Sequence, residues 1–346
     1  MSEEGVIVNH RVTWIEADCS FDASSGETVL DAALRAGVRL PSECAFGGCG
    51  TCRVKLLDGR VQYDEPPLAL SPDEAAAGYA LMCQAKALAD LRISTDRPLP
   101  APVAPERRRA TVVASGPLCN DVQRLVLSLD RETPFAFRPG QYLNVLLGDA
   151  GARSFSMASL PGETSVELHI RRIDGGYFTG ALLDALRPGD ALDVELPLGG
   201  FGYHEEDYRP IVMAATGTGI APLRSMLAAL LPSGDCPPVA LYWGGRTRAD
   251  LYLHDEFVAW SAQYADFSYT PVLSRAGDEW DGARGYVQHA VAADHDDLSE
   301  HALYLCGSPD MIADAKRVFA RHGASVRYLY ADGFTFQRAT PLEAGR

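Results

Sequence analysis

The sequence predicts a multidomain protein of the α+β and α/β classes, with three folding units in series. The chain of 346 residues is too long for one ordinary core. A proline-rich stretch interrupts it at residues 97–109, and from residue 209 short alternating strands give way to strands followed by glycine turns and helices. We place the first domain at residues 1–97, a linker at 98–106, the second domain at 107–207 and the third at 208–346.

The composition is typical of a soluble globular protein. Apolar residues make up 47% and charged residues 22% of the chain, and no run approaches the roughly 20 apolar residues of a membrane span. The start, MSEEGVIVNH, lacks the basic and apolar regions of a signal peptide, so we expect a cytoplasmic protein. The net charge of −15 disfavours nucleic acid and anionic membranes, and suits either solubility or a basic protein partner.

The first domain is predicted to be a small mixed sheet covered by one helix. Residues 6–17, 52–59 and 91–95 have strand patterns, and residues 24–38 form a turn followed by an amphipathic helix. Its cysteines follow the spacing Cys44-x4-Cys49-x2-Cys52, with Cys83 thirty residues later. This is the spacing of plant-type 2Fe–2S centres, whereas structural zinc usually requires two close pairs.

Glycines support the iron–sulfur interpretation. A loop around a cluster must turn its backbone N–H groups toward sulfur, which Gly47, Gly48 and Gly50 allow. Zinc and purely structural thiols stay open as weaker alternatives, and a reducing compartment argues against disulfides. The segments "CAFGGCGTC" and "GYALMCQA" resemble the cluster loop and the fourth-ligand segment of plant-type ferredoxins. The resemblance implies a β-grasp fold and a 2Fe–2S cluster held by Cys44, Cys49, Cys52 and Cys83.

The second domain is predicted to be an antiparallel sandwich or barrel. Apolar runs alternate with turn signals at residues 109–115, 122–129, 141–147, 165–173 and 190–199. Between them lies "RSFSMAS", residues 153–159, where strand alternation puts Arg153 and Phe155 on one side and Ser154 and Ser156 on the other.

This domain resembles the flavin domain of the ferredoxin–NADP reductase superfamily. "RSFS" matches its R-x-Y/F-S motif, with Phe155 where the family usually has tyrosine, and "FRPGQYLNV", "HIRR", "GGYFTGALL" and "PLGGFG" occur in family order. The resemblance implies FAD, with Ser156 near the flavin N5. A helix N-terminus with small residues, together with an arginine, suits a pyrophosphate. The FAD-binding residues expected on this basis are Arg153, Phe155, Ser156, His169, Arg171, Gly175, Gly176 and Thr179.

The third domain is predicted to contain a parallel sheet. The strands "IVMAA", "VALYW" and "ALYLC" each run into a glycine-rich turn, so their carboxyl ends should form a ligand crevice. "GTGIAP" and "CGSP" resemble the signatures of the nicotinamide domain in the same superfamily. The coenzyme-binding residues implied are Gly217, Thr218, Gly219, Gly244, Gly245, Arg246, Cys306, Gly307 and Pro309, with Thr218 and Cys306 beside the nicotinamide.

Two further predictions depend on only a few residues: which coenzyme is used, and which aromatic residue covers the flavin. Arg246 and Arg248 would suit the 2′-phosphate of NADPH, but Asp250 follows them as in relatives that use NADH, so we favour NADH. The tail "YLYADGFTF" resembles that of oxygenase reductases, which have an aromatic in a similar place; Phe334 is the candidate and Phe336 the substitute.

The order of the three modules predicts an electron-transfer chain. Nicotinamide gives two electrons as a hydride, clusters accept one at a time, and flavin converts between them. Residues 6–336 resemble the reductase components of bacterial multicomponent oxygenases, most closely the benzoate or anthranilate 1,2-dioxygenase type and more distantly the soluble methane or phenol monooxygenase type. The resemblance implies a terminal oxygenase partner for an aromatic substrate, docking at the cluster edge near 45–48 and Glu43. A carrier module without catalysis stays an alternative, as does a redox-sensing regulator, although no DNA-binding pattern supports the latter.

Overall fold

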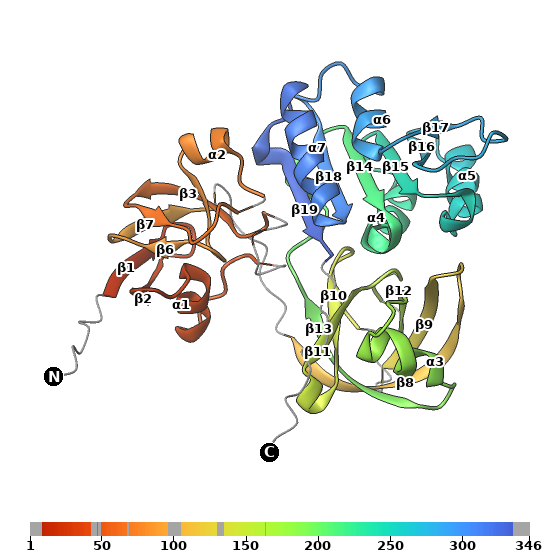
Figure 1. Ribbon diagram of the computed structural model, residues 1–346, viewed down its shortest axis with the longest axis horizontal. Coiled ribbons are helices and arrows are strands. Elements are labelled where there is room, and N and C mark those ends of the chain that lie inside the picture. The colour runs from red at the N-terminus through yellow and green to blue at the C-terminus, as the bar shows by residue number, and fades with distance from the viewer. Residues whose placement is uncertain are drawn as a thin grey trace.

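The three predicted units are visible as separate domains in the computed structural model (Figure 1). The fold class expected from the sequence is confirmed: the N-terminal domain has a mixed sheet, the middle domain an antiparallel sheet and the C-terminal domain a parallel sheet. Within the described residues, no helix is long and apolar enough to cross a membrane. The structure describes residues 9–42, 47, 50–67, 69–95, 105–129, 135–162 and 164–334.

The N-terminal domain contains a five-stranded sheet in the order β2-β1-β7-β3-β5, in which β1 and β7 are parallel. Helix α1 begins after Thr28, whose side chain accepts a hydrogen bond from the Asp31 N–H, and buries four apolar residues against the sheet. The predicted strand start at residues 6–8 lies outside the described residues. The elements are β1 (Asn9–Trp14), β2 (Cys19–Ser24), α1 (Val29–Arg35), β3 (Arg53–Asp58), β4 (Val61–Gln62), α2 (Pro72–Ala76), β5 (Tyr79–Leu81), β6 (Lys86–Ala87) and β7 (Leu91–Ser94).

The middle domain is a six-stranded antiparallel barrel. Its strand order is β11-β10-β13-β8-β9-β12, and a bridge between Met157 and Leu168 joins the two end strands. Alternate residues of β9 fill the core, where Leu125, Leu127 and Leu129 are buried. The strands are β8 (Glu106–Pro117), β9 (Val122–Leu129), β10 (Tyr142–Leu146), β11 (Ala152–Ser156), β12 (Ser165–Arg171) and β13 (Ala191–Leu198).

The C-terminal domain is a doubly wound parallel sheet in the order β17-β16-β15-β14-β18-β19. Helices α4 and α5 pack on one face, and α6 and α7 on the other. The strand order reverses at β14, so the carboxyl ends of β14 and β18 flank the position where such sheets bind ligands. The elements are β14 (Ile211–Thr216), α4 (Ile220–Leu230), β15 (Val239–Gly245), α5 (His254–Gln263), β16 (Phe267–Leu273), β17 (Ala283–Arg284), α6 (Val287–Asp294), β18 (Ala302–Gly307), α7 (Pro309–Arg321) and β19 (Leu329–Gly333).

Candidate functional site

Two of the four predicted cluster ligands are brought together in the N-terminal domain. Cys52 immediately precedes β3, Cys83 follows β5, and their buried Sγ atoms are 3.1 Å apart. Gly47 and Gly50 have left-handed backbones, with φ of 78° and 87°, where a Cβ would be strained. Paired buried thiols beside a glycine-rich turn fit a sulfur-ligated metal centre. The other two predicted ligands, Cys44 and Cys49, lie outside the described residues, as do Glu43, Ala45 and Gly48.

The predicted flavin strand is β11, at the end of the barrel sheet. Its Phe155 packs on Phe178, with ring centroids 5.5 Å apart, while the Ser156 side chain is buried. The Arg153 guanidinium donates to the carbonyl oxygens of Ala150 and Ala152 at 3.3 and 2.8 Å. β11 therefore presents an aromatic surface, a hydroxyl and a cation on neighbouring residues.

A glycine turn lies next to this strand. Gly175 has a φ of 74°, and a Cβ on Gly176 would lie 2.2 Å from the Thr179 hydroxyl, so only glycine fits there. The predicted helix after it is one wide turn, Tyr177–Leu182, followed by the short α3 (Leu183–Ala185). Because Phe178 of that turn packs on Phe155, the structure brings two of the predicted FAD-binding segments together.

A cavity of about 660 Å³ opens at the carboxyl ends of the parallel strands. A Cβ on Gly219 would lie 2.3 Å from the Cys306 carbonyl oxygen, so the backbone of the turn after β14 packs directly on the end of β18. Pro309 begins α7, two residues after the end of β18. Six residues that the sequence predicted for the coenzyme line the cavity: Gly217, Thr218, Gly244, Gly245, Arg246 and Gly307.

Asp332 is a buried acid next to Cys306. The Asp332 carboxyl lies at the end of β19 with Oδ2 4.0 Å from the Cys306 Sγ, and burial raises the pKa of Asp332 to about 7. Phe334 lines the cavity, because its N–H donates to the Gly307 carbonyl at 2.8 Å. The alternative aromatic, Phe336, lies outside the described residues. Sequence reasoning missed Asp332, although an acid at the end of a parallel strand was a usable signal.

Arg171, predicted for FAD, lines the cavity at the carboxyl ends of the parallel strands. Its Nε lies 3.3 Å from the Asp121 carboxylate, and its guanidinium covers Gly217, where a Cβ would lie 2.8 Å from Nη2. Arg171 thus brings a charge from the barrel to the turn after β14. Asp121 and Arg317 also line the cavity, and no motif in the sequence pointed to either of them.

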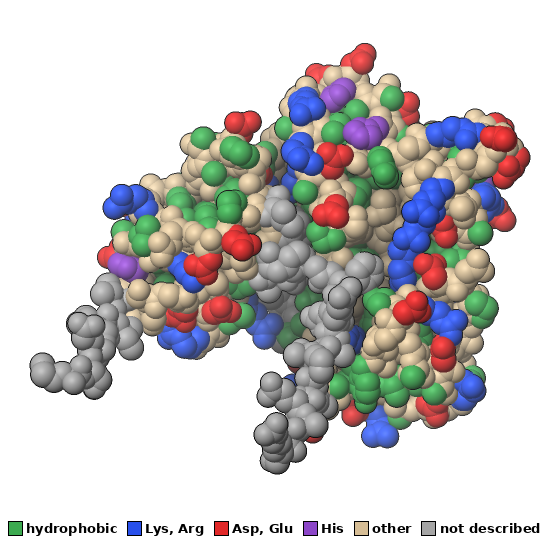
Figure 2. Space-filling model, in the orientation of Figure 1, with side chains coloured by type: hydrophobic (Ala, Val, Ile, Leu, Met, Phe, Trp, Pro, Cys, Tyr) green, Lys and Arg blue, Asp and Glu red, His purple; other side chains and the backbone are tan. Residues whose placement is uncertain are grey.

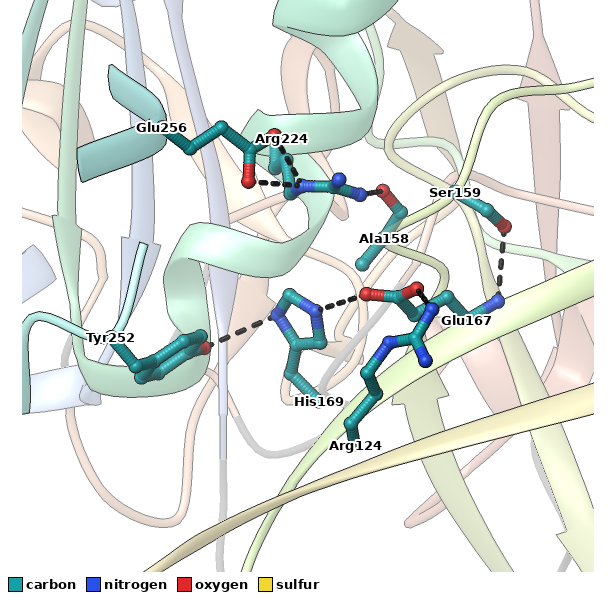
Figure 3. Close-up of polar contacts among 8 residues, drawn as sticks. All are labelled: Arg124, Ala158, Ser159, Glu167, His169, Arg224, Tyr252 and Glu256. Carbon is teal, nitrogen blue, oxygen red and sulfur yellow. Dashed lines mark hydrogen bonds and ion pairs between the residues drawn. The ribbon is translucent and has the colours of Figure 1, made fainter. Parts of the chain in front are cut away.

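His169, also predicted for FAD, has its side chain buried between the barrel and the parallel-sheet domain (Figure 3). Its Nε2 lies 3.0 Å from the Glu167 carboxylate, and its Nδ1 lies 3.3 Å from the Tyr252 hydroxyl. Both ring nitrogens are therefore engaged at the domain junction. The sequence could not indicate this, because Tyr252 belongs to the other domain.

The two arginines considered for coenzyme choice differ in position. Arg246 lines the cavity, whereas the Arg248 guanidinium pairs with Asp255 at 2.9 Å. The Asp250 carboxylate accepts hydrogen bonds from the backbone N–H groups of Arg246 and Thr247, at 2.9 and 2.7 Å. Only one of the two cations thus faces the coenzyme cavity, which fits a nucleotide without a 2′-phosphate better than one with it.

On the surface of the two C-terminal domains, basic side chains gather across their junction (Figure 2).

Polar contacts join the N-terminal domain to the parallel-sheet domain. The Thr51 hydroxyl, next to Cys52, donates to the Ala331 carbonyl in β19 at 3.0 Å. The Lys316 ammonium donates to the Ala69 carbonyl at 3.2 Å. The segment that carries Cys52 therefore lies beside β19, the strand that contains Asp332.

Comparison with known proteins agrees with this architecture. The families "2Fe-2S iron-sulfur cluster binding domain", "Oxidoreductase FAD-binding domain" and "Oxidoreductase NAD-binding domain" match residues 12–88, 109–203 and 213–317. Reductase component 2 of terephthalate 1,2-dioxygenase from Comamonas sp. is 34% identical, over 94% of this chain and 98% of that protein. The reductase component of phenol 2-monooxygenase from Pseudomonas sp. is 38% identical, over 84% of each.

Solved structures give the same result. The cytochrome P450 reductase GcoB of Amycolatopsis has a TM-score of 0.69 and 33% identity, covering 93% of this chain and 97% of that one. The matching domains make the chain an NADH-dependent oxidoreductase whose cofactors are FAD and a 2Fe–2S cluster. The chain belongs to the family of ferredoxin-fused reductases that includes the reductase components of aromatic dioxygenases and monooxygenases.

Proposed function

We propose that this reductase delivers electrons to a terminal oxygenase component that acts on an aromatic substrate, of the benzoate or anthranilate dioxygenase type. The proposed acceptor is supported by the 34% identity to reductase component 2 of terephthalate 1,2-dioxygenase. One observation supports electron transfer within the chain: Thr51, next to Cys52, is hydrogen-bonded to Ala331, one residue before the buried Asp332. The iron–sulfur segment is thus held beside the strand that leads to the coenzyme cavity. Electrons can then pass within one molecule before they leave it.

When bound, FAD would convert between the two-electron chemistry of NADH and the one-electron chemistry of a 2Fe–2S cluster, and the residues of this chain would hold and orient these groups. On the coenzyme side, Gly217 and Gly219 allow close backbone approach, and Arg171 with Arg246 balances the charge of a pyrophosphate. Thr218 and Cys306 would flank the nicotinamide and hold it in place. Phe334 closes the edge of the cavity and keeps water out.

On the flavin side, Phe155 offers a face to the ring system and Ser156 a hydroxyl. Arg153, Gly175, Gly176 and Thr179 form the pyrophosphate site, where a cation and backbone N–H groups meet. His169 contributes only through its backbone, because both of its ring nitrogens are engaged at the domain junction.

For the cluster, Cys44 and Cys49 would complete the ligand set begun by Cys52 and Cys83. The oxygenase docks near residues 45–48, where Glu43 contributes negative charge. The domain limits proposed with this scheme are residues 1–97, 107–207 and 208–346.

The acceptor is tested with purified partners. Holoprotein and NADH are combined with the oxygenase components of terephthalate 1,2-dioxygenase, of phenol 2-monooxygenase and of a cytochrome P450 system, and product formation per NADH is measured. We expect coupled turnover with the dioxygenase, and faster turnover than with the phenol-type monooxygenase, the second candidate. Reduction of cytochrome c with no turnover of any oxygenase would refute the proposed acceptor class. Turnover with the dioxygenase at low salt that is unaffected by Glu43→Lys would refute the docking face.

A further inference from the structure

Two consecutive residues of α4 bind the loop that follows the flavin strand. The Arg224 guanidinium donates to the Ala158 carbonyl at 2.8 Å (Figure 3). The fully buried Ser225 hydroxyl donates to the Ser159 carbonyl at 2.6 Å. Helix α4 begins directly after the coenzyme turn that contains Thr218, and the loop begins directly after Ser156. One rigid helix therefore connects the nicotinamide turn to the flavin strand.

A second route leads from the same turn through aromatic side chains. The Trp243 indole N–H donates to the Gly217 carbonyl at 3.0 Å, and Trp243 is completely buried. Its ring lies edge-on to Tyr252, with centroids 5.1 Å apart and an interplanar angle of 86°. Trp243 thus connects the coenzyme turn to Tyr252, whose hydroxyl contacts His169 of the barrel.

Both routes end at Ser159, in the loop that follows the flavin strand. The Tyr252 hydroxyl is hydrogen-bonded to Nδ1 of His169 in the barrel. Nε2 of His169 is hydrogen-bonded to the carboxylate of Glu167, which lies two residues earlier on β12. The Glu167 N–H donates to the Ser159 hydroxyl at 3.1 Å. The two routes therefore form a closed ring through both domains, shown in part in Figure 3.

The donors and acceptors along this ring are mutually consistent. A carboxylate can only accept, so Nε2 of His169 carries the proton and donates to Glu167. Burial lowers the pKa of His169, so the ring is neutral and Nδ1 accepts from the Tyr252 hydroxyl. Burial raises the pKa of Tyr252 well above its usual value, so the phenol keeps its proton. Buried polar bonds of this kind favour one geometry, because breaking them leaves unsatisfied groups.

We propose that this ring fixes the angle between the barrel and the parallel-sheet domain, and thereby the distance between the nicotinamide and the flavin. Tyr252, His169, Arg224 and Ser225 are its positioning residues. The proposal rests on the FAD and NADH sites proposed above. Transfer between two bound groups is sensitive to small errors in their separation, so the ring acts on the rate and not on coenzyme binding.

The test uses Tyr252→Phe, Ser225→Ala and the double variant in the full-length holoprotein. Flavin reduction is followed by anaerobic stopped-flow absorbance with NADH and with NADH deuterated at nicotinamide C4. We expect the limiting rate of the double variant to fall roughly ten- to hundred-fold. The NADH concentration that gives half the limiting rate should stay within about twofold. The primary isotope effect should become strongly temperature-dependent, a change that mere loss of stability would not produce.

Matched controls lie in the same domain away from the junction. The Tyr269 hydroxyl meets Nδ1 of His254 at 3.4 Å, and the Ser233 hydroxyl donates to the Leu230 carbonyl at 2.7 Å. Tyr269→Phe and Ser233→Ala therefore make the same chemical changes, and we expect wild-type rates from both. Unchanged rates in the junction variants, equal slowing in the controls, or slowing accompanied by loss of FAD would overturn the proposal. Failure of the wild-type protein to bind FAD or to be reduced by NADH would refute the proposed sites instead.

Discussion

Replacing Asp332 with asparagine should remove a pH-dependent cost from the folded state. The Asp332 carboxyl is buried against Cys306, and burial raises its pKa from 3.8 to about 7. Asparagine has nearly the same shape and does not titrate in this range. The variant therefore isolates the effect of the charge.

The size of the effect follows from this shift. Between about pH 4 and pH 7 the unfolded chain ionises Asp332 while the folded protein keeps it protonated, so the free energy of unfolding falls as pH rises. A shift of about three units corresponds to about 4 kcal/mol, an upper limit that is fully lost above pH 7. Asp332→Asn should therefore gain stability relative to wild type by up to this amount between pH 4 and pH 8.

The assay is urea unfolding of both proteins at pH 4, 6 and 8, followed by tryptophan fluorescence. Three tryptophans, Trp243, Trp260 and Trp280, belong to the C-terminal domain with Asp332, so they report on its unfolding. Infrared spectra should show a protonated carboxyl band that disappears from wild type with a midpoint near pH 7 and is absent from the variant. A stability difference that does not change between pH 4 and pH 8 would refute the reasoning.

Three further predictions concern electron flow and coenzyme binding. Cys83→Ser should abolish the cluster signal in electron paramagnetic resonance while NADH still bleaches the flavin; survival of the signal would exclude Cys83 as a ligand. Lys316→Met removes the bond to Ala69 and should slow electron transfer from flavin to cluster but not flavin reduction, with Arg321→Met, at the exposed end of α7, as the surface control in the same stopped-flow experiment. Asp250→Ala leaves two backbone N–H groups of the coenzyme loop without their acceptor and should raise the KM for NADH roughly five- to tenfold; an unchanged KM would count against the loop.

The sequence predicted the fold and the local motifs well, because both depend on patterns within short segments. Strand alternation predicted β9 and the other barrel strands, and the continuous apolar run of β14 predicted the parallel sheet. The glycine turns after β14 and β15 line the cavity at the carboxyl ends of the strands, and a Cβ on Gly219 would collide with the backbone at the end of β18. Such requirements are imposed by the local backbone and are therefore visible in the chain itself.

Contacts between domains were not predictable in this way. Arg171, which the sequence predicts for FAD, also lines the cavity at the carboxyl ends of the parallel strands, because the orientation of β12 toward the next domain is a tertiary property. The role of His169 depends on Tyr252, 83 residues away, and no motif relates the two. Asp332 was passed over because its burial results from packing of the final strand on β18.

The most direct test of the electron-transfer chain is an anaerobic titration of the holoprotein with NADH, followed by absorbance and low-temperature electron paramagnetic resonance. We expect the flavin to bleach and a rhombic one-electron cluster signal to appear with it, at a faster rate than with NADPH. A bleached flavin without a cluster signal would contradict the account, because Cys52 and Cys83 would then not belong to a reducible 2Fe–2S centre.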